Sequence, residues 1–116
     1  MGIITYTEKN GVIVVRLSGD MNISTLDNAE SILSTLLTKQ PVVIALDCGE
    51  LNSIDSTIVS IFVKFLSKAK AGNVKLIFFD LRQTIKHTFD VMQLNRFFTI
   101  ISRKRFEEEY GNGAAR

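Results

Sequence analysis

Two short, largely apolar runs, residues 42–46 and 74–79, constrain the fold of this 116-residue chain more than any other feature. Each run has the length of a β-strand and is rich in β-branched or aromatic residues. Strands that read in this way are buried on both faces, and they pair in parallel beneath covering helices. The sequence therefore predicts an α/β domain with a mostly parallel sheet.

The segments beside these runs carry apolar residues at helical spacing. Residues 24–39 form one such segment, with Ser24 as the expected N-cap and Pro41 as the residue that stops it. A second helix is expected to follow Ser56 and to stop at Gly72. Its broad apolar face comprises Ile58, Val59, Ile61, Phe62, Val63, Phe65, Leu66 and Ala69.

The N-terminal part of the chain reads as an antiparallel hairpin. Residues 3–8 and 12–17 have strand character, and Asn10-Gly11 between them favours a tight turn because both residues tolerate positive φ. Residues 19–22 are then expected to break the second strand. The hairpin adds one antiparallel strand to the predicted sheet.

The C-terminal part continues the alternation of helices and strands. We expect a helix over residues 82–92, a strand over 97–101 and a helix over 103–110; the residues expected to face the core are Ile85, Phe89, Met92, Phe97 and Phe98. Residues 111–116 read as a frayed tail. The predicted order is β-β-α-β-α-β-α-β-α, with about four helices in a single domain over residues 1–110.

Composition and motifs argue against several classes of function. The 14 basic and 12 acidic residues are mixed along the chain, so direct nucleic-acid binding is not supported. The N-terminal residues do not follow the charged-then-apolar pattern expected of a leader, and no apolar stretch reaches the ~18 residues that would span a membrane. We therefore expect a cytoplasmic protein without membrane insertion. With one cysteine, one histidine and no glycine-rich phosphate loop, neither a metal nor a cofactor is expected.

Cys48 and Asp47 are the residues on which an enzyme hypothesis would rest. A nucleophilic Cys48 needs a base within hydrogen-bonding reach, and the sequence offers no such arrangement with His87. Asp47 ends a buried strand, as the phosphate acceptor of a receiver domain does. However, the expected acids after the first strand are missing, and the fourth strand ends in Asp80 where a receiver has lysine. We expect no catalytic residue and a buried, inert cysteine.

The segment around Asp55, Ser56 and Thr57 is the strongest candidate for a functional site. It places two hydroxyl groups at a helix start, behind an Asp that can cap the helix. Free N–H groups and the positive end of the helix dipole make this position favourable for an added phosphate. Because functional loops of parallel sheets follow the carboxyl ends of strands, Asp20 and Asn22 are expected at the same edge. The simpler alternative is that Asp55 and Ser56 only cap the helix.

Four segments of the chain follow the pattern of one known family. They are residues 14–22 (VVRLSGDMN), 51–57 (LNSIDST), 71–76 (AGNVKL) and 90–98 (DVMQLNRFF). In this order they resemble the STAS domain, as it occurs in anti-sigma factor antagonists. The second segment corresponds to the family's Ile-Asp-Ser-Ser/Thr-Gly signature. The resemblance covers nearly the whole chain and implies the STAS fold.

The resemblance implies a specific function without catalytic activity. Such proteins bind an anti-sigma factor that is also a serine kinase, and so free a sigma factor for transcription. The kinase phosphorylates the serine that follows the motif aspartate, which is Ser56 here, and a serine phosphatase reverses the modification. The implied contact and switch residues are Asp20, Asn22, Asp55, Ser56, Thr57 and Ile58. Asp55 would orient and cap, and Thr57 would support the helix start or accept phosphate secondarily.

Three residues differ from the family pattern. Ile58 and Gln93 replace glycines, and Asn22 stands where the family often has Asp. We expect Ile58 to restrict the approach of a kinase to Ser56. This substitution favours an alternative function, in which the domain is a phosphorylation-independent scaffold or a subunit of a signalling or transport complex.

Overall fold

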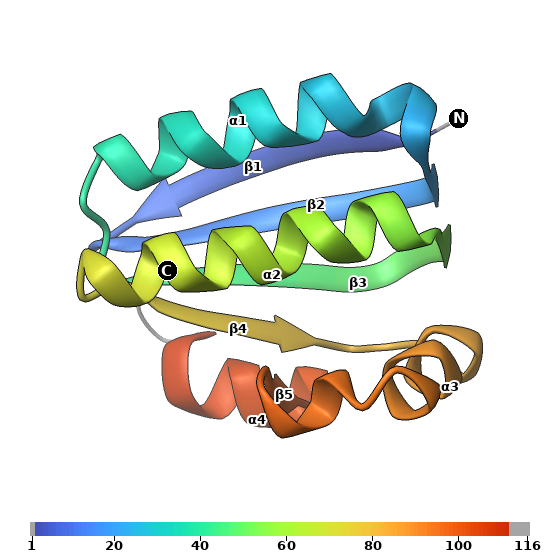
Figure 1. Cartoon of the computed structure of the whole chain (residues 1–116). Coiled ribbons are helices and arrows are strands. Elements are labelled where there is room, and N and C mark those ends of the chain that lie inside the picture. Colours follow the sequence, from blue (N-terminus) through green and yellow to red (C-terminus); the bar gives the residue numbers. More distant parts are fainter. Residues whose placement is uncertain (1, 112–116) are drawn as a thin grey trace.

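The computed structural model describes residues 2–111, which form one five-stranded sheet with helices packed against it (Figure 1). In chain order the elements are β1 (Ile3–Lys9), β2 (Val12–Met21), the 3₁₀ turn η1 (Ile23–Thr25), α1 (Leu26–Thr38), β3 (Val43–Ile54), α2 (Ser56–Ala71), β4 (Lys75–Phe79), α3 (Gln83–Val91), the 3₁₀ turn η2 (Leu94–Arg96), β5 (Thr99–Ile101), α4 (Arg103–Phe106) and the π-helical turn η3 (Glu107–Gly111). The strands and helices follow one another in the predicted order.

The sheet has the strand order β1-β2-β3-β4-β5. β1 pairs antiparallel with β2, whereas β2, β3, β4 and β5 run parallel. Asn10 and Gly11 join the antiparallel pair with φ values of 54° and 81°, in the left-handed region that a tight hairpin uses. The predicted α/β class, with a mostly parallel sheet and one antiparallel hairpin strand, is confirmed.

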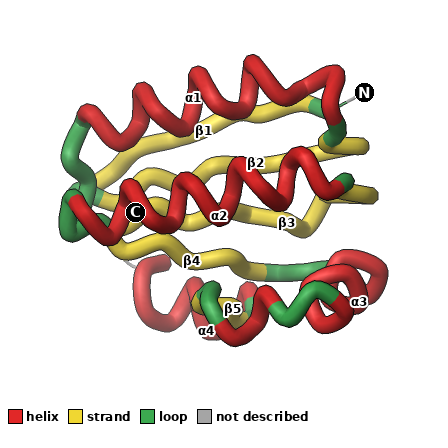
Figure 2. The backbone as a smooth tube through the Cα atoms, viewed as in Figure 1, coloured by secondary structure: helices red, strands yellow, loops and turns green. Residues whose placement is uncertain are grey.

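Helices cover the two faces of the sheet unequally. α1 and α2 lie side by side across one face, where α3 also packs (Figures 1 and 2). The main core lies between these helices and the sheet, and Phe78 is at its centre with edge-on contacts to Phe62 and Phe89. On the opposite face Phe106 of α4 stacks on Phe79 with the ring centroids 4.0 Å apart. The larger core therefore fixes α2, at whose start the candidate site lies.

Two central strands run further than the sequence indicated. β2 continues to Met21 and β3 to Ile54, so Asp20 and Ser53 lie on strands rather than in loops. The parallel ladder pairs Asp20 with Ser53 and Met21 with Ile54, after an irregularity at Gly19, whose φ is 77°. Continued pairing satisfies backbone groups that a loop would leave to water. The prediction that residues 19–22 end the strand was wrong.

Two further boundaries differ by a few residues. α1 begins at Leu26 rather than at Ser24, because Asn22 caps the separate turn η1 before it. β5 begins at Thr99 rather than at residue 97, because the chain is still turning there: the N–H groups of Phe97 and Phe98 both donate to the carbonyl of Leu94.

At the C-terminus, the expected helix over residues 103–110 divides into α4 and η3. Gly111, which we expected to begin a frayed tail, closes η3 and is buried. The rest of that expected tail, residues 112–116, lies outside the described residues. Within residues 2–111, none of the helices combines the length and the apolarity needed to cross a bilayer.

Some apolar residues that we expected in the core lie at the surface, namely Val42, Val63, Met92 and Phe97. Val63 points away from the sheet because a helix buries only one stripe of its circumference. Phe98, rather than Phe97, turns into the core after η2 and contacts Phe78. Of these four residues, Val63 and Phe97 line one groove on the helical face of the molecule.

Candidate functional site

Asp55 connects the start of α2 to the chain segment after β2 through hydrogen bonds. Its Oδ1 accepts hydrogen bonds from the N–H of Ile58 at 3.1 Å and from the hydroxyl of Thr57 at 2.5 Å. Its Oδ2 accepts a hydrogen bond from the N–H of Ile23 at 3.1 Å, and its own N–H donates to the carbonyl of Met21. Asp55 is therefore an N-cap that also holds two distant segments together.

These hydrogen bonds keep the Asp55 carboxylate ionised. The hydroxyl of Thr57 lowers the pKa of Asp55 most, and the backbone N–H groups of Ile58 and Ile23 lower it further. A carboxylate with a low pKa and both oxygens engaged is a poor general base. Asp55 is suited to orienting the helix start rather than to proton transfer.

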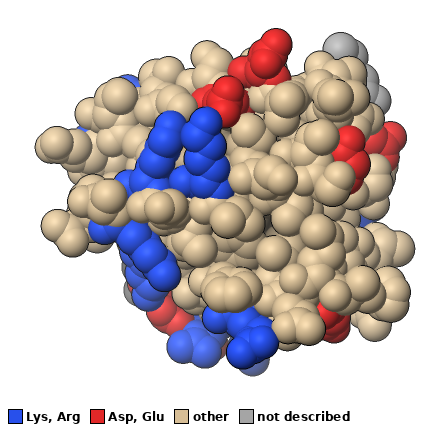
Figure 3. Space-filling model, in the orientation of Figure 1, with Lys and Arg blue, Asp and Glu red and all other residues tan. Residues whose placement is uncertain are grey.

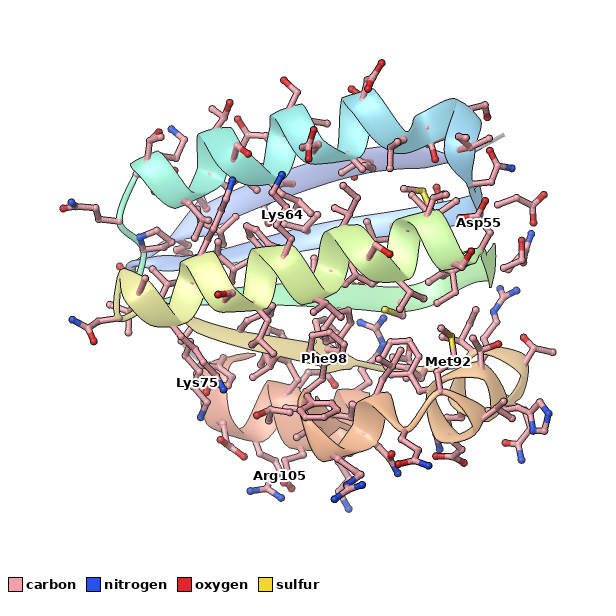
Figure 4. The ribbon with its side chains drawn as sticks, in the orientation of Figure 1. Asp55, Lys64, Lys75, Met92, Phe98 and Arg105 are labelled. Atoms are coloured by element: carbon pink, nitrogen blue, oxygen red, sulfur yellow. The ribbon has the colours of Figure 1, made fainter. Side chains whose placement is uncertain are left out.

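Ser56 and Thr57 differ sharply in their availability. Ser56 is the first residue of α2 and is exposed, and its hydroxyl has no hydrogen-bond partner within residues 2–111. The hydroxyl of Thr57 donates to Asp55, and its side chain is half-buried. Figure 4 places Asp55 at the start of α2, close to the ends of β2 and β3. Of the two hydroxyls, that of Ser56 is the accessible one.

Asp20 and Asn22 lie at the same edge of the sheet and are held by local hydrogen bonds. The hydroxyl of Ser53 donates to Asp20 Oδ1 at 2.7 Å across the β2–β3 pair. Asn22 caps η1, where its Oδ1 accepts hydrogen bonds from the N–H and the hydroxyl of Ser24 at 3.0 and 2.6 Å. The N–H of Asn22 in turn donates to Thr25 Oγ1. The structure thus brings the predicted residues Asp20, Asn22, Asp55, Ser56 and Thr57 to one edge.

Ile58 does not belong to this surface. Its side chain is 0% exposed and lies in the main core. It can neither contact a partner nor stand in the way of one, so the predicted contact role and the expected restriction of a kinase were both wrong. The reason is that Ile58 falls on the inner side of the first turn of α2, where only its N–H serves the cap.

Gln93, the other residue that replaces a family glycine, adopts a φ of 57° and a ψ of 30° at the end of α3. This is the left-handed conformation that glycine adopts without strain. The substitution therefore affects the turn before η2, on a part of the chain that the candidate site does not use.

The sequence analysis missed Ile23, which is 68% exposed beside Asp55. A single exposed apolar side chain is ordinary at a protein surface, so Ile23 is notable only for its place beside Asp55. Ile23 is the first residue of η1, and the Asn22 cap that fixes this turn is known only from the structure. In the sequence, the one available signal was an isoleucine within a polar turn.

Neither residue of the enzyme hypothesis is available for catalysis. Cys48 is completely buried, and burial raises the pKa of its thiol, with further increases from Asp47 and Asp80. The carboxylate of Asp47 is paired with Arg103 at 2.6 Å and lies 3.7 Å from Arg16. Across residues 2–111, no group of three or more His, Cys, Asp or Glu side chains is placed to hold a metal ion.

Comparisons with known proteins agree with this architecture. The model of the STAS domain family matches residues 4–107. No curated protein matches the sequence significantly. The fold is similar to that of a putative anti-sigma factor antagonist from Thermotoga maritima, with a TM-score of 0.81 and 17% identity over 91% of this chain and 92% of that one.

Two further solved structures share the fold. The phosphorylated form of the Bacillus cell fate determinant SpoIIAA has a TM-score of 0.71 and 15% identity over 92% of this chain and 98% of its own. A sulfate transporter family protein from Wolinella succinogenes has a TM-score of 0.71 and 13% identity over 82% and 80% of the two chains. Because the family model covers nearly all of the sequence, the chain belongs to the STAS domain family.

Proposed function

We propose that this protein is an anti-sigma factor antagonist that binds an anti-sigma factor with serine kinase activity. In this proposal phosphorylation of Ser56 abolishes binding, a serine phosphatase restores it, and sigma-factor-dependent transcription responds. The main support is the contrast between the free, exposed hydroxyl of Ser56 and the engaged hydroxyl of Thr57. The structural similarity to anti-sigma factor antagonists supports the general role.

The electrostatics of the helix start suit such a switch. A phosphate adds about −1.5 to −2 charges, which the N-terminus of α2 accommodates without disturbing the core below. In a protein interface the same charge is costly. A loss of about 2–3 kcal/mol in that interface would weaken binding roughly 30- to 150-fold. The domain therefore stays folded while its partner is released.

The contact surface would comprise Asp20, Asn22, Ser56 and the exposed side chain of Ile23. Ile23 would enter an apolar pocket of the partner, while the polar groups around it would form hydrogen bonds at the rim. Asp55 would hold Ile23 and Ser56 at a fixed separation through the two oxygens of its carboxylate.

Affinity capture from the lysate of the native host tests the binding step. The baits are wild type, Ser56→Asp and Ser31→Asp, which adds the same charge on an exposed part of α1. We expect an anti-sigma factor with a kinase domain on the wild-type and Ser31→Asp baits and at least about tenfold less of it on Ser56→Asp. The same partners on all three baits would reject the switch.

Phosphorylation by the captured kinase then tests the acceptor. We expect incorporation of phosphate into wild type and into Thr57→Val, but none into Ser56→Ala. Equal labelling of wild type and Ser56→Ala would show that another residue is the acceptor.

A second function is favoured by one observation, the fold similarity to a sulfate transporter family protein. In this case the domain is a phosphorylation-independent scaffold or a subunit of a signalling or transport complex. Its partners would be membrane or scaffold proteins, and they would bind the wild type and Ser56→Asp equally.

A further inference from the structure

A second surface lies on the helical face, in the groove between the C-terminal half of α2 and the segment around η2. The groove has a volume of about 340 Å³ and is lined by Val63, Leu66, Ser67, Lys70, Leu94 and Phe97. Leu94 is buried, whereas Val63 and Phe97 remain 47% and 63% exposed. Exposed apolar side chains that converge on one groove are typical of an interaction site rather than of ordinary surface.

The groove runs along α2. Leu66 and Ser67 lie three and four residues after Val63, and Lys70 lies four and three residues after them, so the four side chains form a stripe on one side of that helix. Phe97 and Leu94 form the opposite wall. An elongated groove of this kind fits a helix that presents apolar side chains at the matching interval, with roughly two or three of them as anchors.

The charge around the groove is positive. Lys70 lines it and Arg96 directly precedes Phe97, and within residues 2–111 neither forms an ion pair; Arg96 bonds only the amide oxygen of Gln93. Figure 3 shows Lys and Arg gathered on the half of this face where α2 ends, while Asp and Glu lie towards its margins.

We propose that this groove binds an amphipathic helix of a partner protein, whose apolar residues are flanked by carboxylates. The apolar side chains would contact Phe97 and Val63, and the carboxylates would pair with Lys70 and Arg96. The site is separate from the edge at Ser56. At about 1.5 Å per residue, Lys70 lies roughly 21 Å from Ser56 along α2.

The test uses fluorescently labelled synthetic peptides as probes. The first is a helical peptide of about 14 residues with leucines at positions i, i+3, i+4 and i+7 and glutamates around them. In the second, lysine replaces every glutamate. Fluorescence anisotropy measures their binding to wild type, Phe97→Ser, Lys70→Glu and Ile23→Ser. Ile23→Ser is the matched control, since it also removes an exposed apolar side chain, but at the Ser56 edge.

We expect the acidic peptide to bind wild type with a Kd of roughly 10–100 μM, and the lysine peptide at least about fivefold more weakly. Phe97→Ser weakens binding of the acidic peptide about tenfold, while Ile23→Ser leaves it unchanged. Lys70→Glu weakens the acidic peptide and strengthens the lysine peptide. Amide chemical shifts change at residues 63–70 and 94–97.

Other results would overturn the proposal. They are equal binding of both peptides, full binding by Phe97→Ser, or no saturable binding at about 1 mM peptide. Dimerisation of the wild type that Phe97→Ser abolishes would assign the groove to a second copy of the chain. Sedimentation with phosphatidylglycerol vesicles that depends on Phe97 would assign it to a membrane. Urea denaturation checks that each variant is folded.

Discussion

Asp55 links the candidate site to the stability of the fold at the scale of one residue. Its carboxylate accepts hydrogen bonds from the hydroxyl of Thr57 and from the backbone N–H groups of Ile58 and Ile23, which are far apart in sequence. The same contacts that orient Ser56 therefore also stabilise the folded state. A change at Asp55 should be visible in folding as well as in partner binding.

The low pKa of Asp55 predicts a specific dependence of stability on pH. Its pKa in the folded protein is below the ordinary 3.8, chiefly because the hydroxyl of Thr57 donates to it. The unfolded chain therefore binds the proton more readily, and the stabilisation is present above the unfolded pKa and lost as the pH falls through the folded pKa. We expect wild type to lose stability more steeply than Asp55→Asn between about pH 5 and pH 2.

Urea denaturation over this pH range makes the comparison. Asp55→Asn is the matched variant, because its amide oxygen still accepts the N–H of Ile58 at the N-cap. If the free energy of unfolding of the two proteins fell in parallel with pH, protonation of Asp55 would not be linked to folding.

How far single residues could be predicted depended on whether their neighbours were local. Asp55 and Ser56 were found because a cap and a first helical residue can be recognised within a few positions of sequence. Ile23 was missed because its N–H donates to Asp55, 32 residues further along the chain. Ile58 was wrongly counted among the contact residues, although its place in the core follows from periodicity. Periodicity assigned Ile58 to the apolar face of α2, whereas the resemblance to the family signature led us to count it among the contact residues.

At the scale of elements, the hairpin, the helices and the central strands followed from periodicity, while the ends of β2 and β3 did not. The second half of β3 contains Glu50, Asn52 and Ser53, which read as a loop. Pairing with β2 keeps them extended, and Arg82 also binds the carbonyl of Gly49 and the side chain of Asn52. Such long-range hydrogen bonds outweigh the weak strand propensity of polar residues.

Arg103 shows how one side chain joins several elements on the far face of the sheet. From the start of α4 it donates to Asp47 on β3 at 2.6 Å and to Asp80 after β4 at 2.8 Å, and its guanidinium lies 5.1 Å from the ring centroid of Phe79. Gly49 is needed beside this cluster, since a Cβ there would lie 2.6 Å from Asp80 Oδ2. The cluster therefore ties α4 to two strands.

Removal of Arg103 should destabilise the protein more than removal of a surface arginine. The side chain of Asp47 is 3% exposed, so Arg103→Met leaves a buried charge without its nearest partner. We expect a loss of about 1–3 kcal/mol, below the range for fully buried pairs because Arg103 is partly exposed. Arg105→Met, which breaks only the exposed pair with Glu109, should change stability much less, because solvent screens an exposed ion pair.

Urea denaturation of the two variants tests this ranking. Adding Asp47→Asn to Arg103→Met should recover part of the stability, because the buried charge is then removed. Equal losses for Arg103→Met and Arg105→Met would mean that the cluster contributes no more than a surface ion pair.

At the scale of the whole molecule, α2 carries two surfaces of different character on one rigid support. Its start presents Ser56 among polar groups, and its second half presents an apolar groove with basic neighbours. Between them Phe62 and Phe65 are buried in the main core, so the helix is packed along its length. If both proposed sites bind, the domain would hold one partner while it exchanges another.

The two surfaces should therefore act independently. A closely packed helix offers no second arrangement through which charge at one end could alter binding at the other. We expect Ser56→Asp to change the affinity of the acidic peptide for the groove by less than about twofold, although the proposed switch requires it to weaken binding at the Ser56 edge at least about tenfold. Anisotropy titrations of wild type, Ser56→Asp and Ser31→Asp measure this directly. A change of fivefold or more in Ser56→Asp alone would demonstrate coupling along α2, and the rigid-support argument would then fail.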